Sequence, residues 1–273
     1  MPSPKLALLL TALPLVAALT YESEIADWRA QREASLRRDG GWLTVTGLFW
    51  LHEGPNTFGT AKNDDVVLPA GPAQAGVFEL HNGKVTAKMA GATRDLRPDT
   101  DDVFNVDRLR LYAILRAGRV GIRMKDSQSD FRRNFHGLDY FPAREDYRVV
   151  AQFVPDPKKI PITNILGQTE PEESPGYVIF RLRGQEYRLR PVFDDPGSRD
   201  LFFIFKDQTS GKETYGAGRF LDTAPPKNGQ VELDFNKAYN PPCVFTPYAT
   251  CPLPPKENRL ALRIEAGEKM YGH

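Results

Sequence analysis

The segment 233–255 constrains the fold more than any other part of the chain, because it holds both cysteines and six of the 23 prolines. Proline fixes φ near −65° and has no backbone N–H to donate, so a segment this rich in proline does not continue a helix or a central strand. The same segment is dense in polar and aromatic side chains. We therefore expect one rigid loop of defined shape, close to a binding or catalytic site.

The amino-terminal residues have the pattern of a Sec signal peptide. Lys5 supplies a positive charge, residues 6–19 form an apolar run, and cleavage after Ala18 or Thr20 fits the small residues there. The run is short for a membrane span, although an uncleaved anchor is the alternative. We expect residues 1–20 to be removed, and the mature protein to be periplasmic or secreted with no membrane attachment.

Two cysteines outside the cytoplasm favour a disulfide. Cys243 and Cys251 are close in sequence, and closing the loop between them stabilises the fold by roughly 2–3 kcal/mol in the chain-entropy model. Two free thiols are the next alternative. A metal site is the least favoured, because the spacing is not C-x2-C and the four histidines are scattered. We expect no metal and no cofactor.

The composition is that of a globular protein with many turns. Aromatic residues make up 11% of the chain, which also has 22 glycines, and this combination favours a mostly-β fold. The formal net charge is +1, which generates no strong field toward nucleic acid. We expect no nucleic-acid partner and an unknown small molecule as ligand.

Turn signals and hydrophobic periodicity divide the chain into four parts after the signal segment. We expect an N-terminal helix in residues 21–41, a small β-sandwich over 42–126, a linker over 127–146, and a second antiparallel β-sheet or barrel-like domain over 147–273. Trp28 on the helix is expected to pack against the domain that follows it. The predicted strands are 42–51, 57–60, 66–68, 76–80, 84–89, 108–116, 119–125, 147–154, 160–165, 176–182, 185–193, 201–207, 213–220, 231–235 and 260–265.

The start of the sandwich resembles a forkhead-associated-type domain over residues 54–68, through Phe58-Gly59-Thr60 and the run 65–69. That resemblance implies a phosphothreonine site with an arginine, a serine and a histidine. Here Thr60 stands in place of the arginine, and Ala73 and Gly76 stand about where the other two belong. The groups that hold a phosphate are therefore missing, and we expect the fold without the phosphopeptide activity.

The chain has no G-x-S-x-G, H-E-x-x-H, Walker A or strand-linked G-x-G-x-x-G motif. Three groups of residues remain as candidates. On the predicted strand 213–220, Tyr215 and Arg219 share one face and fit an anionic or sugar-like group, unless they form a surface cross-strand pair. Glu257 and Glu268 are interpreted as exposed surface charge, with a carboxylate pair for acid–base chemistry as the less favoured alternative.

The third group follows the predicted strand 231–235. Asp234 and Asn236 share a strand face, and Tyr239, Asn240 and Tyr248 follow them. These side chains fit hydrogen bonding to a ligand, with loop-backbone hydrogen bonding as an equally weighted alternative. His136, in the linker, is a candidate general base or a structural histidine.

Several of these motifs resemble a family known as domain of unknown function 1684. The resemblance is carried most specifically by residues 234–243, 250–255, 257–260 and 266–269. It is also carried by residues 42–51, 54–59, 133–138 and 214–219. It implies membership of an uncharacterised bacterial and archaeal family and adds no catalytic residues.

From these features we expect a binding protein for a small, anionic or sugar-like molecule. The alternatives are a hydrolase or lyase that uses His136 or Asp234 as base, and a structural module without a pocket. The sequence leaves open whether the protein is an enzyme.

Overall fold

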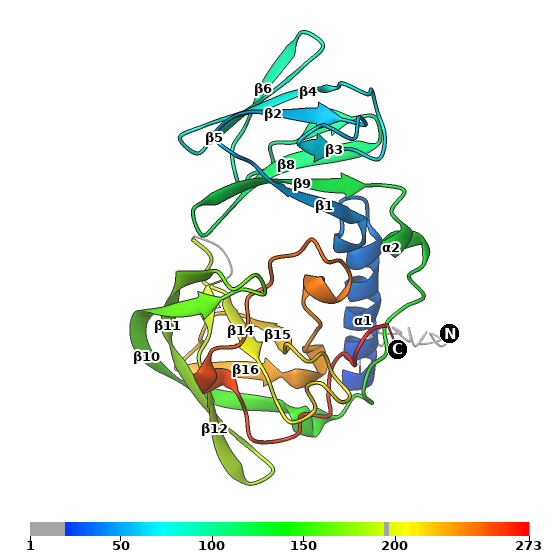
Figure 1. Cartoon of the computed structure of the whole chain (residues 1–273). Helices are drawn as coiled ribbons and strands as arrows, with labels where there is room; N and C mark the ends of the chain where they lie inside the picture. Colours follow the sequence, from blue (N-terminus) through cyan, green and yellow to red (C-terminus); the bar gives the residue numbers. More distant parts are fainter. Residues whose placement is uncertain (1–19, 194–196, 273) are drawn as a thin grey trace, which may run out of the picture.

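A computed structural model describes residues 20–193 and 197–272, and the fold is mostly β (Figure 1). The predicted signal segment lies outside the described residues, apart from Thr20. The elements are α1 (Tyr21–Arg37), η1 (Trp42–Thr44), β1 (Val45–Trp50), β2 (Gly54–Gly59), β3 (Val66–Val67), β4 (Gly76–His81), β5 (Lys84–Met89), β6 (Ala92–Leu96), β7 (Phe104–Val106), β8 (Leu109–Arg116), β9 (Arg119–Asp126), α2 (Asp130–Arg133), η2 (Glu145–Tyr147), β10 (Arg148–Thr163), β11 (Thr169–Leu182), β12 (Gln185–Leu189), β13 (Val192–Phe193), β14 (Leu201–Phe205), β15 (Arg219–Thr223), β16 (Gln230–Asp234), η3 (Phe235–Lys237), η4 (Pro242–Val244) and η5 (Lys256–Asn258).

The helix α1 forms where the periodicity predicts it. Thr20 caps it by accepting a hydrogen bond from the backbone N–H of Ser23 at 3.3 Å, and Glu22 and Glu24 in the first turn favour the positive end of the helix dipole. None of the described helices is long and apolar enough to cross a membrane.

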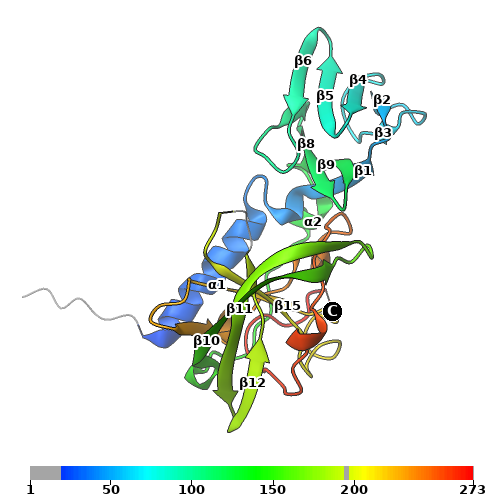
Figure 2. The same ribbon diagram turned by 90° about the vertical axis from the view of Figure 1, so that its left-hand side faces the viewer.

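The part of the chain from residue 133 onward is called the C-terminal body below. The polar contacts of α1 are made mainly with this part, and not with the sandwich that follows α1 in sequence. Arg29 donates to the carbonyl of Phe141 at 2.7 Å, and Arg32 pairs with Glu268 at 2.8 Å. Figure 2 shows α1 lying along the C-terminal body. Glu268, expected at the surface, is fully buried in this contact. These contacts join the helix to residues that are far away in the sequence.

The predicted sandwich is formed by two sheets, in the orders β1-β9-β8-β7 and β3-β2-β4-β5-β6. They enclose one apolar core, to which β2 contributes Phe58, β4 contributes Phe78 and β9 contributes Ile122. Because side chains alternate along a strand, β9 turns Val120, Ile122 and Met124 toward this core and sends Arg123 and Lys125 to the opposite face. That opposite face meets the C-terminal body.

The C-terminal body has two sheets, β12-β11-β10-β16 and β13-β14-β15. Two separate strands were predicted over 147–154 and 160–165, but β10 runs through both and pairs with β11 as a long curved hairpin (Figure 2). Pro155 lies where the register shifts, so the proline-rich stretch bends the strand at a bulge and does not end it. The described sheets stay open, and the predicted barrel closure is not found.

The segment 213–218 is a turn, although a strand was predicted over 213–220. Gly218 has a φ of +111°, and a Cβ there would lie 2.6 Å from the carbonyl oxygen of Phe205. The backbone therefore needs glycine at this close approach, and β15 begins only at Arg219.

Strand β14 is buried on both of its faces. Leu201, Phe203 and Phe205 enter the core of the C-terminal body. Phe202 and Ile204 point the other way, into a second apolar cluster that also holds Cys251. This second face positions the candidate site.

Candidate functional site

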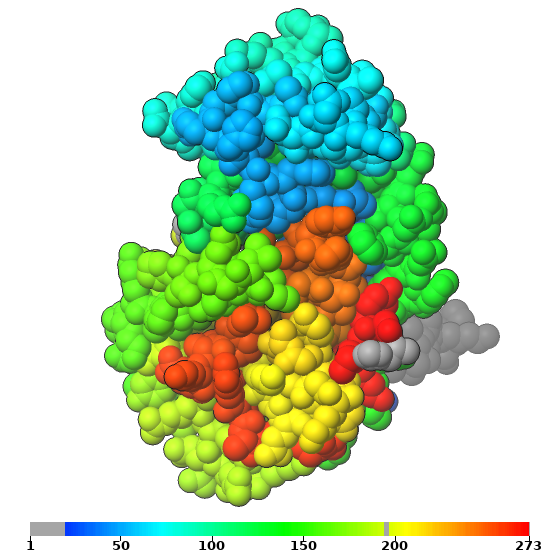
Figure 3. Space-filling model, viewed as in Figure 1, coloured from blue at the N-terminus to red at the C-terminus, as the bar shows by residue number. Residues whose placement is uncertain are grey.

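The proline-rich loop at 241–254 joins three parts of the molecule. The hydroxyl of Thr246 donates to the carbonyl of Val45 in the sandwich at 2.8 Å, and Arg32 of α1 donates to the carbonyl of Asn240 just before the loop at 2.9 Å. At its far end, the carbonyl of Cys251 accepts the N–H of Ile165 in the β10–β11 hairpin at 2.9 Å. Figure 3 shows the orange C-terminal segment against the blue residues of the sandwich. The loop is thus fixed at both ends and in the middle.

The predicted disulfide is not formed in the structure. Cys243 and Cys251 are free thiols, and the backbone N–H of Cys243 donates to the Cys251 sulfur at 3.1 Å. The loop keeps its shape through hydrogen bonds and proline geometry without a covalent crosslink.

Arg219, a predicted ligand-binding residue, is 1% exposed and makes its contacts with the protein itself. Its guanidinium donates to the backbone carbonyls of Ala266, Ile264 and Glu268 and pairs with Asp207 at 3.4 Å. These bonds tie the last extended segment of the chain to β15. Arg219 lines neither of the two hollows described below.

Asp234 and Asn236 do lie together, but they hold the start of α1. One carboxylate oxygen of Asp234 accepts from the Tyr21 hydroxyl at 2.8 Å and from the backbone N–H of Asn236 at 3.1 Å. The amide of Asn236 bonds Tyr21 and both backbone groups of Arg144. The loop-backbone alternative therefore describes these two residues.

The other predicted residues are dispersed. Asn240 is buried, and its amide donates to the carbonyl of Lys269 at 2.7 Å. Tyr215 lies against the Cys243 sulfur, the backbone N–H of Tyr248 bonds Thr246, and His136 is exposed. Of the eight predicted site residues, only Tyr239 lines the large cleft described next.

That cleft lies between the sandwich, α1 and the C-terminal body and has a volume of about 1210 Å³. Ile162 of β10, Phe202 and Ile204 of β14 and Phe220 of β15 form an apolar floor. Trp28 of α1 lines the same space. The chain segments that build the cleft are far apart in sequence, which is why no local motif marks it.

Two cations of β9, missed by the sequence analysis, line the cleft from the sandwich side. Arg123 is 4% exposed. One of its terminal nitrogens donates to the hydroxyl of Thr250 at 3.3 Å, its guanidinium lies over the Trp42 ring at 5.3 Å, and its Nε has no hydrogen-bond partner. Among the buried arginines of the described chain, Arg190 and Arg219 have carboxylate partners and Arg123 has none.

Lys125, two residues further along β9, is also without an ion pair among the described residues. Burial, with the guanidinium groups of Arg110, Arg123 and Arg38 nearby, lowers the pKa of Lys125 to about 8. Arg110 lies directly opposite Lys125 on β8, and like charges facing each other across strands destabilise a sheet. The sandwich thus presents an uncompensated positive face to the cleft.

Four carboxylates line the cleft, and among them only Asp99 forms an ion pair with another described residue. Asp99 pairs with Arg116 at 2.7 Å. Asp222 lines the cleft, and burial of its carboxylate by surrounding protein atoms raises its pKa. This carboxylate accepts a hydrogen bond from the Tyr239 hydroxyl at 2.8 Å. Burial raises the pKa of Glu172, as does its neighbour Glu170, while Arg116 lowers it. None of these carboxylates forms an ion pair with Arg123 or Lys125.

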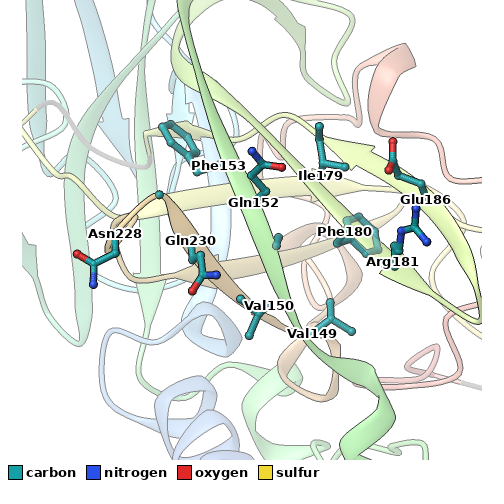
Figure 4. Close-up of a pocket in the computed structure, with 12 residues that line it drawn as sticks. Val149, Val150, Gln152, Phe153, Ile179, Phe180, Arg181, Glu186, Asn228 and Gln230 are labelled. Carbon is teal, nitrogen blue, oxygen red and sulfur yellow. The ribbon is translucent and has the colours of Figure 1, made fainter.

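A second hollow lies on the outer face of the sheet β12-β11-β10-β16 and has a volume of about 800 Å³ (Figure 4). Val150, Gln152 and Gln230 line it, and Val150 is 63% exposed. This hollow is open and contains no buried charge without a partner. No group of histidine, cysteine or acidic residues in the described chain is arranged to hold a metal ion.

Comparison with known proteins places the C-terminal body in a described family. Residues 133–269 match the model for a protein of unknown function, DUF1684. A solution NMR structure of an uncharacterized protein from Haloarcula marismortui is 33% identical to this chain, covers 50% of it and 78% of its own length, and has a TM-score of 0.42. No curated protein matches the chain.

Proposed function

The chain belongs to the DUF1684 family, and we propose that it binds a small organic anion in the cleft between its sandwich and its C-terminal body. The observation that carries this proposal is Arg123: a buried guanidinium that lines the cleft with an unsatisfied Nε and no carboxylate partner. We also propose that the protein acts outside the cytoplasm, on the evidence of the signal-like segment 1–20.

A buried charge without a partner is costly, because removal from water is not repaid by a counter-charge. In Arg219 the cost is offset by Asp207 and three carbonyls. In Arg123 the polar contacts are with Thr250 and with Tyr112, both uncharged. A bound carboxylate or phosphate supplies the missing charge and a bidentate partner for the guanidinium.

Lys125 supports the same assignment. Its ammonium lies 5.0 Å from the centre of the Tyr112 ring, on the same strand face as Arg123. Burial lowers the Lys125 pKa, and so does repulsion from Arg110, Arg123 and Arg38. An anion between Arg123 and Lys125 relieves that repulsion. Binding is therefore expected to raise that pKa and to weaken as the pH passes above about 8.

The floor of the cleft favours a ligand with an apolar or aromatic body. Ile162, Phe202 and Phe220 lie there, and pockets of this kind bind small molecules mainly through apolar contact, with a few polar groups that fix orientation. The floor comes from the part that matches the family, whereas both cations come from the sandwich, outside residues 133–269. The sandwich thus supplies the charge that selects the anion.

The test is binding of a panel of aromatic and aliphatic carboxylates and phosphates, measured by thermal shift and by titration calorimetry at low salt. The wild type is expected to bind at least one of them saturably, since a ligand stabilises the state that it binds. Arg123→Met should raise the Kd at least about tenfold, because it removes a charge-assisted hydrogen-bond pair.

Arg119→Met is the matched control. It removes the same charge from the same strand, but Arg119 is exposed, lies over Trp50 and does not line the cleft. The affinity of the Arg119→Met variant for the anion should equal that of the wild type. Equal affinity in the Arg123 variant, or no binding by any anion of the panel, would refute the proposal.

A further inference from the structure

The two cysteines lie in contact and are held by separately anchored segments, and Cys251 lines the cleft. Cys243 is in the short turn η4 and donates its backbone N–H to the Cys251 sulfur at 3.1 Å. Cys251 is held from the other side, because its carbonyl accepts the N–H of Ile165 in the β10–β11 hairpin. Hydrogen bonds therefore bring the two residues together before any covalent bond forms.

The two thiols differ in access to solvent. Cys251 is 5% exposed and belongs to the apolar cluster under the cleft, whereas Cys243 is half-buried. Cys243 is therefore the more exposed of the two residues to a reagent that arrives from bulk solvent. The hydroxyl of Tyr215 hydrogen-bonds the Cys243 sulfur, and such a donor stabilises a thiolate, which is the reactive form of cysteine.

We propose that Cys243 and Cys251 are a reversible thiol–disulfide pair, in which Cys243 attacks a small-molecule disulfide and Cys251 resolves the intermediate. The Cys243 thiolate bonds to one sulfur of the reagent, whose S–S bond breaks and whose second sulfur leaves as a thiolate and takes up a proton. Cys251 loses its proton to solvent and attacks the Cys243 sulfur, which expels the remaining reagent thiolate. The protein gives up two electrons and two protons, and the reagent becomes two thiols.

The acid–base properties of the pair agree with these roles. Hydrogen bonds from Cys251 and then from Tyr215 lower the pKa of Cys243, against the effect of its burial. Burial raises the pKa of Cys251. Cys243 is therefore the better attacking group at neutral pH, and Cys251 becomes reactive only once its sulfur faces a mixed disulfide. The exchange does not require the cleft to bind an anion.

The test uses the full chain, reduced and then incubated with glutathione disulfide, quenched with iodoacetamide and weighed by intact mass spectrometry. The wild type should form an internal disulfide that accepts no alkylating group, and excess reduced glutathione should restore both thiols. Cys251→Ser should stop at one mixed disulfide with glutathione, and Cys243→Ser should react much more slowly.

Three results would overturn the proposal. They are a wild type that keeps two alkylatable thiols in oxidising glutathione, a disulfide that reduced glutathione does not open, and equal trapping by the two serine variants. Circular dichroism of each variant checks that it is folded.

Tyr215→Phe separates a role in reactivity from a role in packing. Without the hydroxyl, the midpoint of the pH profile for alkylation of Cys243 in Cys251→Ser should rise, and the rate at pH 7 should fall at least about threefold, because less thiolate is present. Tyr248→Phe is the control, because Tyr248 lies in the same proline-rich loop as the two cysteines. This variant should leave the pH profile unchanged. An unchanged profile in the Tyr215 variant contradicts the assigned hydrogen bond.

Discussion

Two sets of buried polar residues in this protein look alike in sequence and differ in what surrounds them. The first set lies in the C-terminal body and consists of Arg219, Asp234 and Asn236. Their side chains form hydrogen bonds with backbone carbonyls and with Tyr21 of α1. Arg123 and Lys125, on β9, face a cleft without a carboxylate partner in the described chain. The comparison teaches that burial of a polar group indicates a binding site only when its partners are missing.

Two buried oxygens in the C-terminal body are exceptions, one on Asp234 of this set and one on Asn240 near it. The second carboxylate oxygen of Asp234 has no hydrogen bond, although the Lys237 ammonium lies 3.8 Å away, and the side-chain oxygen of Asn240 is also unsatisfied. Neither residue lines the cleft. The distinction therefore rests on charge: these groups are neutral or near a cation, whereas the Arg123 charge is uncompensated.

The largest effect is expected at Arg219. Arg219→Met leaves the fully buried Asp207 carboxylate without its cation and three carbonyls without a donor. Breaking a buried pair in this way costs about 3–5 kcal/mol, so urea denaturation should show a marked loss of stability. If Arg219→Met is as stable as the wild type, Arg219 is not the structural residue that the comparison assumes.

A smaller loss of stability is expected from a change at the contact between α1 and the C-terminal body. Tyr21→Phe deletes the hydroxyl that donates to Asp234 and accepts from Asn236, which should cost about 1–2 kcal/mol of unfolding free energy. Anion affinity should not change, because none of these residues lines the cleft. A large change in anion affinity in Tyr21→Phe, with no change in stability, would mean that Asp234 and Asn236 act in binding and are not structural residues.

Arg123→Met should behave in the opposite way to Arg219→Met. Replacing an uncompensated buried charge by an apolar side chain of similar length is neutral or stabilising, so the unfolding free energy should stay within about 1 kcal/mol of the wild type or rise above it. Denaturation without ligand measures this. A loss above about 2 kcal/mol would mean that Arg123 is a structural residue like Arg219.

A pH dependence of stability is also expected at Lys125. The pKa of Lys125 is lowered to about 8 from its ordinary value of 10.5, so between these values the folded chain binds fewer protons than the unfolded chain. Stability from this group therefore increases as the pH rises from 8 to 10.5 and is lowest below pH 8.

Lys125→Met should accordingly be more stable than the wild type at pH 7, with a difference that shrinks as the pH approaches 10.5. Thermal unfolding of both proteins across pH 7–10.5 tests the sign. Arg119→Met, which removes an exposed charge on the same strand, should show no such trend with pH.

Local patterns were sufficient for much of the fold. The helix predicted within residues 21–41 and the strands 84–89 and 119–125 agree with α1, β5 and β9, and the expected mostly-β fold agrees with the four sheets. These predictions depend on capping, periodicity and turn residues, which act over a few positions. The strand predicted at 213–220 is found only from Arg219 onward, and the close approach of Gly218 to Phe205 is a tertiary contact that the sequence does not show.

The candidate site was located only in part. The proline-rich loop does line the cleft through Pro242, Thr250 and Cys251, and Tyr239 lines it as well. The cations were missed because a lysine and an arginine on an exposed-looking strand face are ordinary in a sequence. The available signal was the alternation of β9, which places Arg123 and Lys125 on one face, opposite Tyr112 and Arg110 of β8.

By itself, the sequence determined where the backbone turns, where it is stiffened by proline, and which faces of the strands are apolar, since these follow from φ preferences and short-range periodicity. Only the tertiary structure decided which polar groups have partners. Arg219 and Arg123 each occupy a β-strand of ordinary composition, and what separates them is that Asp207 and the last extended segment enclose the first, while an open cleft faces the second.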